Sequence, residues 1–300
     1  MRVTTVTGHK VASIEPQCIW PVAAELGEGP IWLADEQALY FVDIKGQNIH
    51  RWHVNSEPTT WHMPQPVGFV QPLQEGGLIA GLKDGLYRFL APASLARTHQ
   101  PEPTVPGNRL NDAFTDPDGQ LWFGSMDDDE QAPSGSLYYI DATGNVIRQD
   151  TDYVITNGPA MSPDGRIFYH TDTLARTVYA FDLGTGKKLL HKRALIHIQN
   201  GYPDGTAVDA AGCLWVALFA GARVERYSPW GELLQTVLFP CANVTKMAFG
   251  GDDLCMAYVT TAWKGLSPKD RVAQPMAGGL FSFTVDTPGL PQGKIRKGFS

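Results

Sequence analysis

Short runs of alternating apolar and polar residues recur along the whole chain, and turn signals rich in glycine, aspartate and asparagine separate them. Strict alternation over a few residues is typical of half-buried β-strands, whereas a helix needs apolar residues spaced three and four apart. No window of about 15 residues sustains the helical spacing. The pattern therefore predicts an all-β protein built from many short strands.

The strands are organised in six similar segments, each with a turn, an alternating strand, a short link and a second strand. The first apolar residue after each turn serves as a reference position: Leu39, Leu78, Leu121, Ile167, Leu214 and Leu254. Successive reference positions are 39, 43, 46, 47 and 40 residues apart. This period is that of a four-stranded propeller blade, and units so evenly spaced fit a β-sandwich poorly. The sequence predicts a six-bladed β-propeller.

We expect one domain over residues 1–300, with residues 1–10 as an N-terminal extension. The strand-like segment "VASIEPQCIW" (11–20) precedes the first blade. A ring of blades is stable only when it closes on itself, so this segment is predicted to pair with the last blade, after "GGLFSFTVD".

Composition limits the classes of partner. The net charge is −7 and no basic block occurs, which disfavours a nucleic-acid-binding protein. No apolar run approaches the ~18 residues of a membrane span, and the first twenty residues lack a signal-peptide core, so we expect a cytoplasmic protein without a membrane partner. The four cysteines show no CxxC spacing and are predicted to be free thiols.

Oxygen-bearing side chains recur about ten residues before the reference positions, where each innermost strand should begin. The residues found there are Glu28, Asn111, Asn157, Asp204 and Asn243, with Gly68 at the corresponding position of the second blade. Such residues also begin strands as ordinary turn residues, but innermost strands converge on one axis, so equivalent positions face one another. Carboxylates and amides in a channel are poorly solvated unless a cation binds them, and oxygen ligands suit Ca²⁺, Mg²⁺, Mn²⁺ or Fe²⁺. The pattern predicts a metal site, with Asn157 as a ligand rather than a turn residue.

Four phrases carry a family resemblance: "LGEGPIW", "NRLNDAFTDPDGQLWFGSM", "ITNGPAMSPDGRIFYHTDT" and "YPDGTAVDAAGCLWVA". Through them the chain, from Leu26 to about Val285, resembles the gluconolactonase and regucalcin (senescence marker protein) family, and most of all its bacterial lactonases of pentonic sugar acids. The resemblance implies a six-bladed fold. It also implies metal-dependent hydrolysis of a sugar lactone to the aldonic acid, with xylonolactone or arabinonolactone expected ahead of gluconolactone.

The resemblance implies roles for single residues. Glu28, Asn157 and Asp204 would hold one divalent ion (Fe²⁺, Ca²⁺, Mn²⁺, Zn²⁺ or Mg²⁺), and Asp204 would also activate water as the general base. Arg109 and Asn111 match the family's substrate-binding pair. The family has an acidic residue after "GSM" that contacts sugar hydroxyls. In the run "DDDE" (127–130) this residue is expected to be Asp129, with Asp128 as the second choice.

Two other functions remain open: a metal-dependent organophosphate or ester hydrolase on the same fold, and a non-enzymatic calcium-binding propeller. Serine-hydrolase chemistry is disfavoured because no GxSxG motif occurs, and no HExxH motif is present. His170 is expected either to hydrogen-bond within its blade or to line the pocket. Lys246 is expected to be salt-bridged or to extend its stem along apolar surface. Three tryptophans at strand positions are predicted to lie in the core between blades: Trp32, Trp122 and Trp215.

Overall fold

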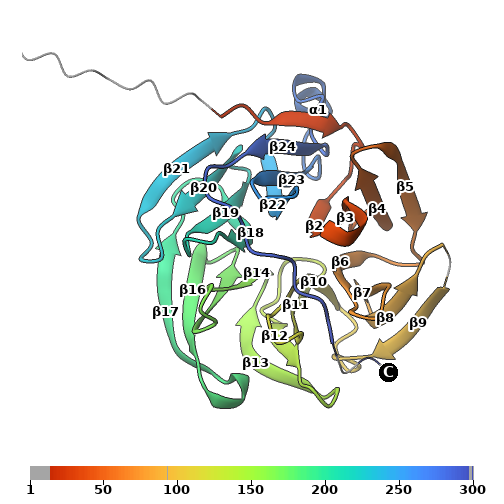
Figure 1. The fold of residues 1–300 in the computed structure, drawn as a ribbon, viewed down its shortest axis with the longest axis vertical. Helices are drawn as coiled ribbons and strands as arrows, with labels where there is room; N and C mark the ends of the chain where they lie inside the picture. Colours follow the sequence, from red (N-terminus) through yellow and green to blue (C-terminus); the bar gives the residue numbers. More distant parts are fainter. Residues whose placement is uncertain (1–13, 93, 297–298, 300) are drawn as a thin grey trace, which may run out of the picture.

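The computed structural model describes residues 14–300 except 93, 297, 298 and 300, and it is a ring of six four-stranded antiparallel sheets (Figure 1). Blade 1 contains β2 (Gly27–Leu33), β3 (Ala38–Asp43), β4 (Asn48–His53) and β5 (Ser56–His62). Blade 2 contains β6 (Val67–Pro72), β7 (Leu78–Leu82), β8 (Gly85–Leu90) and β9 (Ser94–His99). Blade 3 contains β10 (Asn108–Thr115), β11 (Leu121–Asp127), β12 (Gly135–Ile140) and β13 (Val146–Tyr153).

The second half of the ring follows the same plan. Blade 4 contains β14 (Thr156–Met161), β15 (Ile167–Asp172), β16 (Thr177–Leu183) and β17 (Leu189–His197). Blade 5 contains β18 (Tyr202–Val208), β19 (Leu214–Phe219), β20 (Arg223–Tyr227) and β21 (Leu233–Leu238). Blade 6 contains β22 (Asn243–Gly250), β23 (Met256–Ala262), β24 (Leu280–Thr284) and β1 (Gln17–Trp20). Short helical segments are α1 (Pro268–Ala273) and the 3₁₀ turns Ala34–Glu36 and Thr185–Lys187.

The ring closes as the sequence predicts. Strand β1 pairs antiparallel with β24, with Gln17 opposite Ser282 and Cys18 opposite Phe281. The last blade therefore combines strands from both ends of the chain, and the six-bladed fold is confirmed. Residues 11–13 of the predicted closing segment, and the predicted extension 1–10, lie outside the described residues.

Five of the six reference positions lie at or within one residue of the start of the second strand of their blade. The sixth prediction was wrong: Leu254 lies two residues before β23, in a turn, with a left-handed φ of 58°. The turn after β22 itself contains an apolar residue, Leu254, which the pattern takes for the strand start. The error moves the reference position by two residues and leaves the number of blades unchanged.

The three tryptophans bury their rings between adjacent blades, as predicted. Trp122 packs against Phe168 of blade 4, with ring centroids 4.4 Å apart, and Trp32 stacks on Tyr258 of blade 6 at 5.3 Å. The Trp215 ring lies 6.2 Å from that of Phe249, also in blade 6. Large aromatic rings dominate the energetics of a core, so these contacts hold neighbouring blades together.

The C-terminal segment, residues 286–296, crosses the ring from blade 5 to blade 2 (dark blue across the centre of Figure 1). Gly289 forms a bridge with Asp209, and Ile295 forms one with Leu73. The Gln292 side chain donates to Gln71 Oε1 at 2.9 Å. Residues 290–293 cover the end of the channel where the innermost strands finish, so the other end is the one available for a site.

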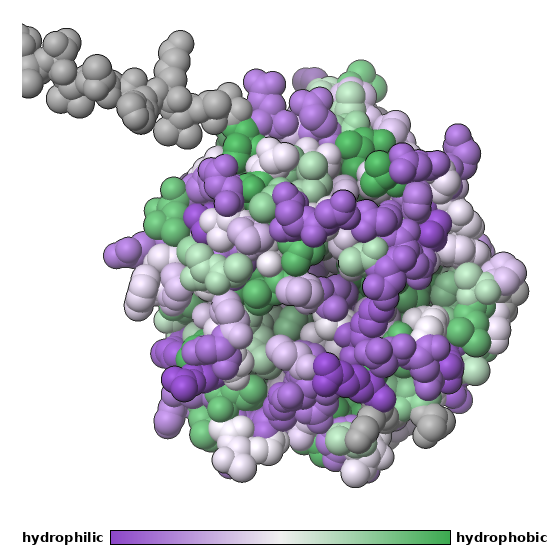
Figure 2. Space-filling model, viewed as in Figure 1, coloured by the Kyte–Doolittle hydropathy of each residue, from purple (hydrophilic) through white to green (hydrophobic). Residues whose placement is uncertain are grey.

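Figure 2 shows the molecule from the same side, with hydrophilic and hydrophobic residues interspersed rather than gathered in one large apolar area. In the described part of the chain, no helix is long and apolar enough to span a membrane. All four cysteines are free thiols, as predicted; Cys213 and Cys241 are buried, and Cys18 and Cys255 are partly exposed.

Candidate functional site

A cavity of about 250 Å³ lies at the end of the channel where the innermost strands begin. Five of the predicted site residues line it together: Glu28, Arg109, Asn111, Asn157 and Asp204. They come from β2, β10, β14 and β18, which belong to four different blades. The remaining lining residues are Leu26, Met126, Glu130, Ile155, Thr173, Leu174, Tyr202, Phe219 and Lys264. The fold thus brings distant parts of the sequence to one place on the axis.

A β-bulge positions these side chains. In all six innermost strands the pairing with the second strand shifts register near the start of the strand. Glu28 and Asn157 lie at the edge of their bulges, and Asn111 and Asp204 lie within theirs. A bulge leaves a residue out of the ladder and redirects side chains, and such bulges are common beside active sites. Pro159 lies in one, where the ladder does not need its missing donor.

Two glycines make the bulges possible. Gly29 and Gly158 follow Glu28 and Asn157, and each has a left-handed φ of 56° that other residues rarely adopt. A Cβ at Gly158 would lie 2.6 Å from Thr206 Oγ1 in the next blade. Asn157 itself lies in strand β14. The "NG" pair is therefore not a hairpin turn, and its glycine allows close approach between blades 4 and 5.

Hydrogen bonds fix the Asn157 amide from both sides. Its Nδ2 donates to Thr173 Oγ1 at 2.9 Å, and its Oδ1 accepts from Asn111 Nδ2 at 2.9 Å. Asn111 Oδ1 in turn accepts from Arg109 Nη1 at 2.5 Å. Because a carbonyl oxygen has two lone pairs, Asn157 Oδ1 keeps one for a further partner.

Three carboxyl groups and one ammonium are buried around the cavity floor. Glu28, Asp112, Asp204 and Lys246 are each at most 7 % exposed. Lys246 Nζ donates to Asp112 Oδ1, and Asp112 Oδ2 accepts from the Gly158 amide at 2.9 Å. The Lys246–Asp112 pair is thereby satisfied, whereas Glu28 and Asp204 have no salt bridge to any residue that the structure describes.

Burial raises the pKa of the Glu28 carboxyl to about 7, and the negative charge of Asp112 adds to the rise. Burial also holds the pKa of Asp204 well above its ordinary range, with the charges of Glu28 and Asp112 contributing; Lys246 opposes both rises. An isolated buried carboxylate is costly, so these two groups need protons or a cation. Two carboxylates beside an amide oxygen are a hard donor set whose charge matches one divalent cation.

The donor set at the cavity floor combines the carboxylates of Glu28 and Asp204 with the amide oxygen of Asn157. Within the described residues, no group of three or more His, Cys, Asp or Glu side chains is arranged to hold a metal ion. Any divalent ion at the cavity floor therefore depends on Asn157 as well as on Glu28 and Asp204. The residues present fit that role by charge and by donor chemistry.

Residues 26–263 match the family model of the SMP-30/gluconolactonase/LRE-like region. The chain belongs to this family. It is 33% identical over 284 residues to 6-deoxy-6-sulfogluconolactonase of Pseudomonas putida, an alignment covering 92% of this chain and 97% of that protein. It is 34% identical over 292 residues to regucalcin of Danio rerio, covering 94% and 98%. The resemblance seen in the sequence is confirmed.

A solved structure of a family member has the same fold. The crystal structure of regucalcin from Agrobacterium tumefaciens, described as a calcium-binding protein, superimposes with a TM-score of 0.90 at 26% identity, covering 95% of this chain and 98% of that one. The family and the fold are thus established independently of the site residues.

The acidic residue predicted at Asp129 is not placed at the cavity. Asp129 is exposed and is not a lining residue, whereas Glu130 lines the cavity and pairs with Lys264, which lines it too. Asp128, the second choice, lies behind Arg109, with its Oδ1 3.1 Å from Arg109 Nε and 2.9 Å from Lys45 Nζ. Sequence reasoning missed Glu130 because the run of four acids gives no periodic signal. Lys264, in the long β23–β24 connection, carries no signal at all.

His170 takes neither of its predicted roles. It is fully buried in β15 and does not line the cavity, and neither ring nitrogen has a hydrogen-bond partner among the described residues. Its ring meets that of Tyr153 edge-on at 4.7 Å. Lys246 takes the salt-bridged role that the sequence left open.

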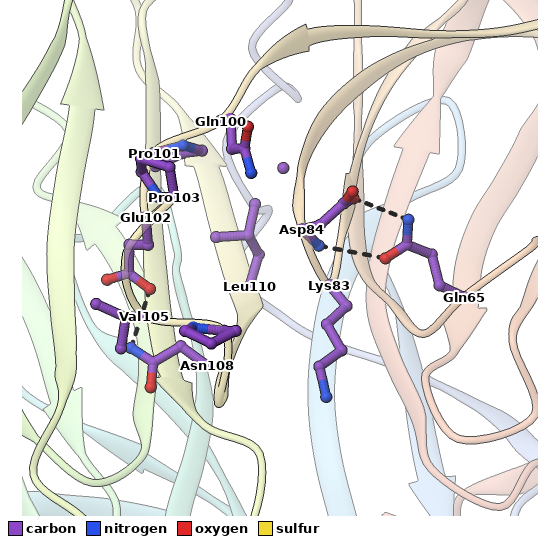
Figure 3. A pocket seen from close by; sticks show the side chains of 12 residues that line it. Gln65, Lys83, Asp84, Gln100, Pro101, Glu102, Pro103, Val105, Asn108 and Leu110 are labelled. Atoms are coloured by element: carbon purple, nitrogen blue, oxygen red, sulfur yellow. Dashed lines mark hydrogen bonds between the residues drawn. The ribbon is translucent and has the colours of Figure 1, made fainter.

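A second cavity of about 200 Å³ lies beside the first, between blades 2 and 3 (Figure 3). Two pairs of its polar side chains are hydrogen-bonded to each other. Gln65 Nε2 donates to Asp84 Oδ1 at 2.8 Å, and Asn108 Nδ2 donates to Glu102 Oε2 at 2.9 Å. It contains none of the predicted site residues, so the cavity on the axis is the candidate active site.

Proposed function

We propose that the protein hydrolyses the lactone ring of a sugar acid, using a divalent cation held by Glu28, Asn157 and Asp204. The observation that carries the proposal is the pair of buried carboxylates, Glu28 and Asp204, in a cavity that also presents Arg109 and Asn111. Neither carboxylate has a salt bridge among the described residues, since Lys246 is paired with Asp112. The names of the P. putida relative and of the family support a lactone as the substrate.

A bound divalent cation polarises a carbonyl oxygen and lowers the pKa of water. Asp204 is the carboxylate proposed to take the proton from the attacking water and to return it to the ring oxygen as the ring C–O bond breaks. The product is the open-chain hydroxy acid. Burial of Asp204 at 6 % exposure keeps bulk water from competing for that proton.

Arg109 and Asn111 are proposed to orient the substrate. Arg109 is held by Asn111 and by the carbonyl of Leu110, and its charge is matched by Asp128, so its position is fixed before substrate arrives. Groups held in place in this way supply orientation at little entropic cost. The preference for xylonolactone or arabinonolactone over gluconolactone remains a prediction from the resemblance.

The experiment is a panel of pentono- and hexonolactones, with a phosphotriester as the rival substrate, assayed with the wild type, Asp204→Asn and Asp252→Asn. Asp252 is exposed, which makes its variant a matched control. We expect aldonolactone hydrolysis, lost by roughly 10²- to 10⁴-fold in Asp204→Asn only. Faster turnover of the phosphotriester than of any lactone would show that the protein is an organophosphate hydrolase instead. If no substrate is turned over while metal is bound, the protein is a non-enzymatic calcium-binding propeller.

A further inference from the structure

One side of the candidate active site is apolar. Ile155, Leu174, Tyr202 and Phe219, here called the apolar wall, line the cavity from blades 4 and 5. Of the other lining residues, Arg109, Glu130 and Lys264 come from blades 3 and 6, and the carboxyl groups of Glu28 and Asp204 lie at the cavity floor. One side of the cavity can therefore hydrogen-bond to hydroxyl groups of a ligand. On the other side, the Tyr202 hydroxyl is the one side-chain group of the apolar wall that can do so.

The apolar wall is not part of the closed core. All four side chains are partly or largely exposed, and Leu174 is 45% exposed. Leu26 and Met126, which also line the cavity, are by contrast buried. Clustered exposed apolar side chains inside a concavity are typical of a ligand-contact surface, because water there is displaced favourably by an apolar group.

The wall is held in place before any ligand binds. The turn carrying Leu174 is fixed by bonds from the Thr173 amide to Ile155 O at 3.2 Å and from the Ala175 amide to Asp172 Oδ1 at 3.0 Å. The Thr173 hydroxyl also accepts from Asn157, which ties this turn to the floor of the cavity. The exposure of Leu174 is therefore a property of a fixed turn.

The aromatic half of the wall is equally constrained. Tyr202 and Phe219 are direct cross-strand partners in β18 and β19. The guanidinium of Arg176 lies 4.6 Å from the centre of the Tyr202 ring, and Arg176 Nη1 donates to Gln199 O at 3.0 Å. A rigid apolar surface binds a ligand without losing side-chain entropy.

We propose that the enzyme also hydrolyses lactones that carry an alkyl substituent, with the alkyl group on the apolar wall and the lactone carbonyl at the cavity floor. The proposal rests on the proposed lactonase function and extends it to a second substrate class. Aliphatic side chains such as Leu174 and Ile155 offer hydroxyl groups no partner, whereas each buried methylene of a substrate gains free energy there. Water adds to the carbonyl carbon, the ring C–O bond breaks and the ring oxygen takes the proton, as in the sugar reaction.

The experiment measures kcat/KM for δ-valerolactone, δ-hexalactone, δ-octalactone and δ-decalactone beside an aldonolactone, after subtraction of spontaneous hydrolysis. We expect kcat/KM to rise with chain length by up to about fourfold per methylene that reaches the wall. The alkyl lactones should inhibit aldonolactone hydrolysis competitively, which places both classes in one cavity. Leu174→Asn should flatten the rise with chain length.

Leu234→Asn is the matched control, because Leu234 is 51% exposed on the outermost strand β21 and should leave the slope unchanged. A flat or falling series in an enzyme that hydrolyses the aldonolactone overturns this inference and leaves the proposed function intact. Absence of turnover for every lactone overturns both. An unchanged slope in Leu174→Asn also rejects the wall as the alkyl site.

Discussion

Asn111 Nδ2 donates a hydrogen bond of 2.9 Å to Oδ1 of Asn157, and so joins a proposed substrate-binding residue of blade 3 to a proposed metal ligand of blade 4. The two residues are 46 positions apart in the sequence and belong to corresponding bulges. The proposed function therefore couples substrate orientation to metal binding through one pair of amides.

Asn111→Ala should weaken divalent metal binding by about 10- to 100-fold, because the partner that orients the Asn157 carbonyl is lost. Isothermal titration of the metal-free protein with Ca²⁺ or Mn²⁺ measures the change. Asn55→Ala, at an exposed position, is the control and should bind as the wild type does. Equal affinities in the two variants would show that Asn111 does not support a metal ligand.

Glu130→Gln should raise KM for an aldonolactone by roughly 10-fold with a smaller effect on kcat, because Glu130 reaches the cavity and a charged hydrogen-bond acceptor is lost. Asp129→Asn is the control from the same acidic run, and its KM should not move since Asp129 is exposed. A raised KM in Asp129→Asn, with an unchanged KM in Glu130→Gln, would show that Asp129 contacts the substrate, as the sequence predicted.

Metal affinity should rise with pH. Because the pKa of Glu28 is raised to about 7 and that of Asp204 is raised as well, an incoming ion must displace protons at low pH, which costs about tenfold in affinity per pH unit for each proton. For the same reason the metal-free protein should lose stability as pH rises from about 4.5 to 7, because the folded state binds more protons than the unfolded state there. Titrations at pH 6 and 8, in buffers of different ionisation enthalpy, count the released protons. Affinity that does not change with pH would contradict the assignment.

His170→Phe should reduce the loss of stability in acid. Burial lowers the pKa of His170 to about 3, so the unfolded chain binds a proton below about 6.5 that the folded protein excludes. Between pH 7 and 5 this costs the wild type about 2 kcal/mol, which the variant avoids. Urea unfolding at both pH values measures the difference, with exposed His62→Phe as the control. Parallel pH dependence in wild type and His170→Phe would refute the explanation.

The periodicity predicted the blades because every blade must bury both of its faces against its neighbours, which repeats the same apolar pattern along the chain. The closing strand was predictable because an open ring would leave an unpaired edge. The bulges were not predictable, since the phrases around Glu28 and Asn157 give residue types and not register. Glu130 and Lys264 escaped prediction because they lie on connections between strands, where no period operates. His170 illustrates a third limit, since its burial depends on Tyr153 from the neighbouring blade.

In the proposed function, Glu28, Asn157 and Asp204 together hold one divalent cation that lactone hydrolysis requires. The most direct measurement is titration of metal-free protein with Fe²⁺, Mn²⁺, Zn²⁺ and Ca²⁺, following bound metal and aldonolactone turnover on the same samples, for the wild type and for Glu28→Gln, Asn157→Ala and Asp204→Asn. We expect one ion per chain, turnover that rises with occupancy, and affinity weakened by more than about 100-fold in each variant, since even outer partners of a metal cost about 10- to 100-fold. Full turnover without metal, or unaltered binding in the three variants, would contradict it.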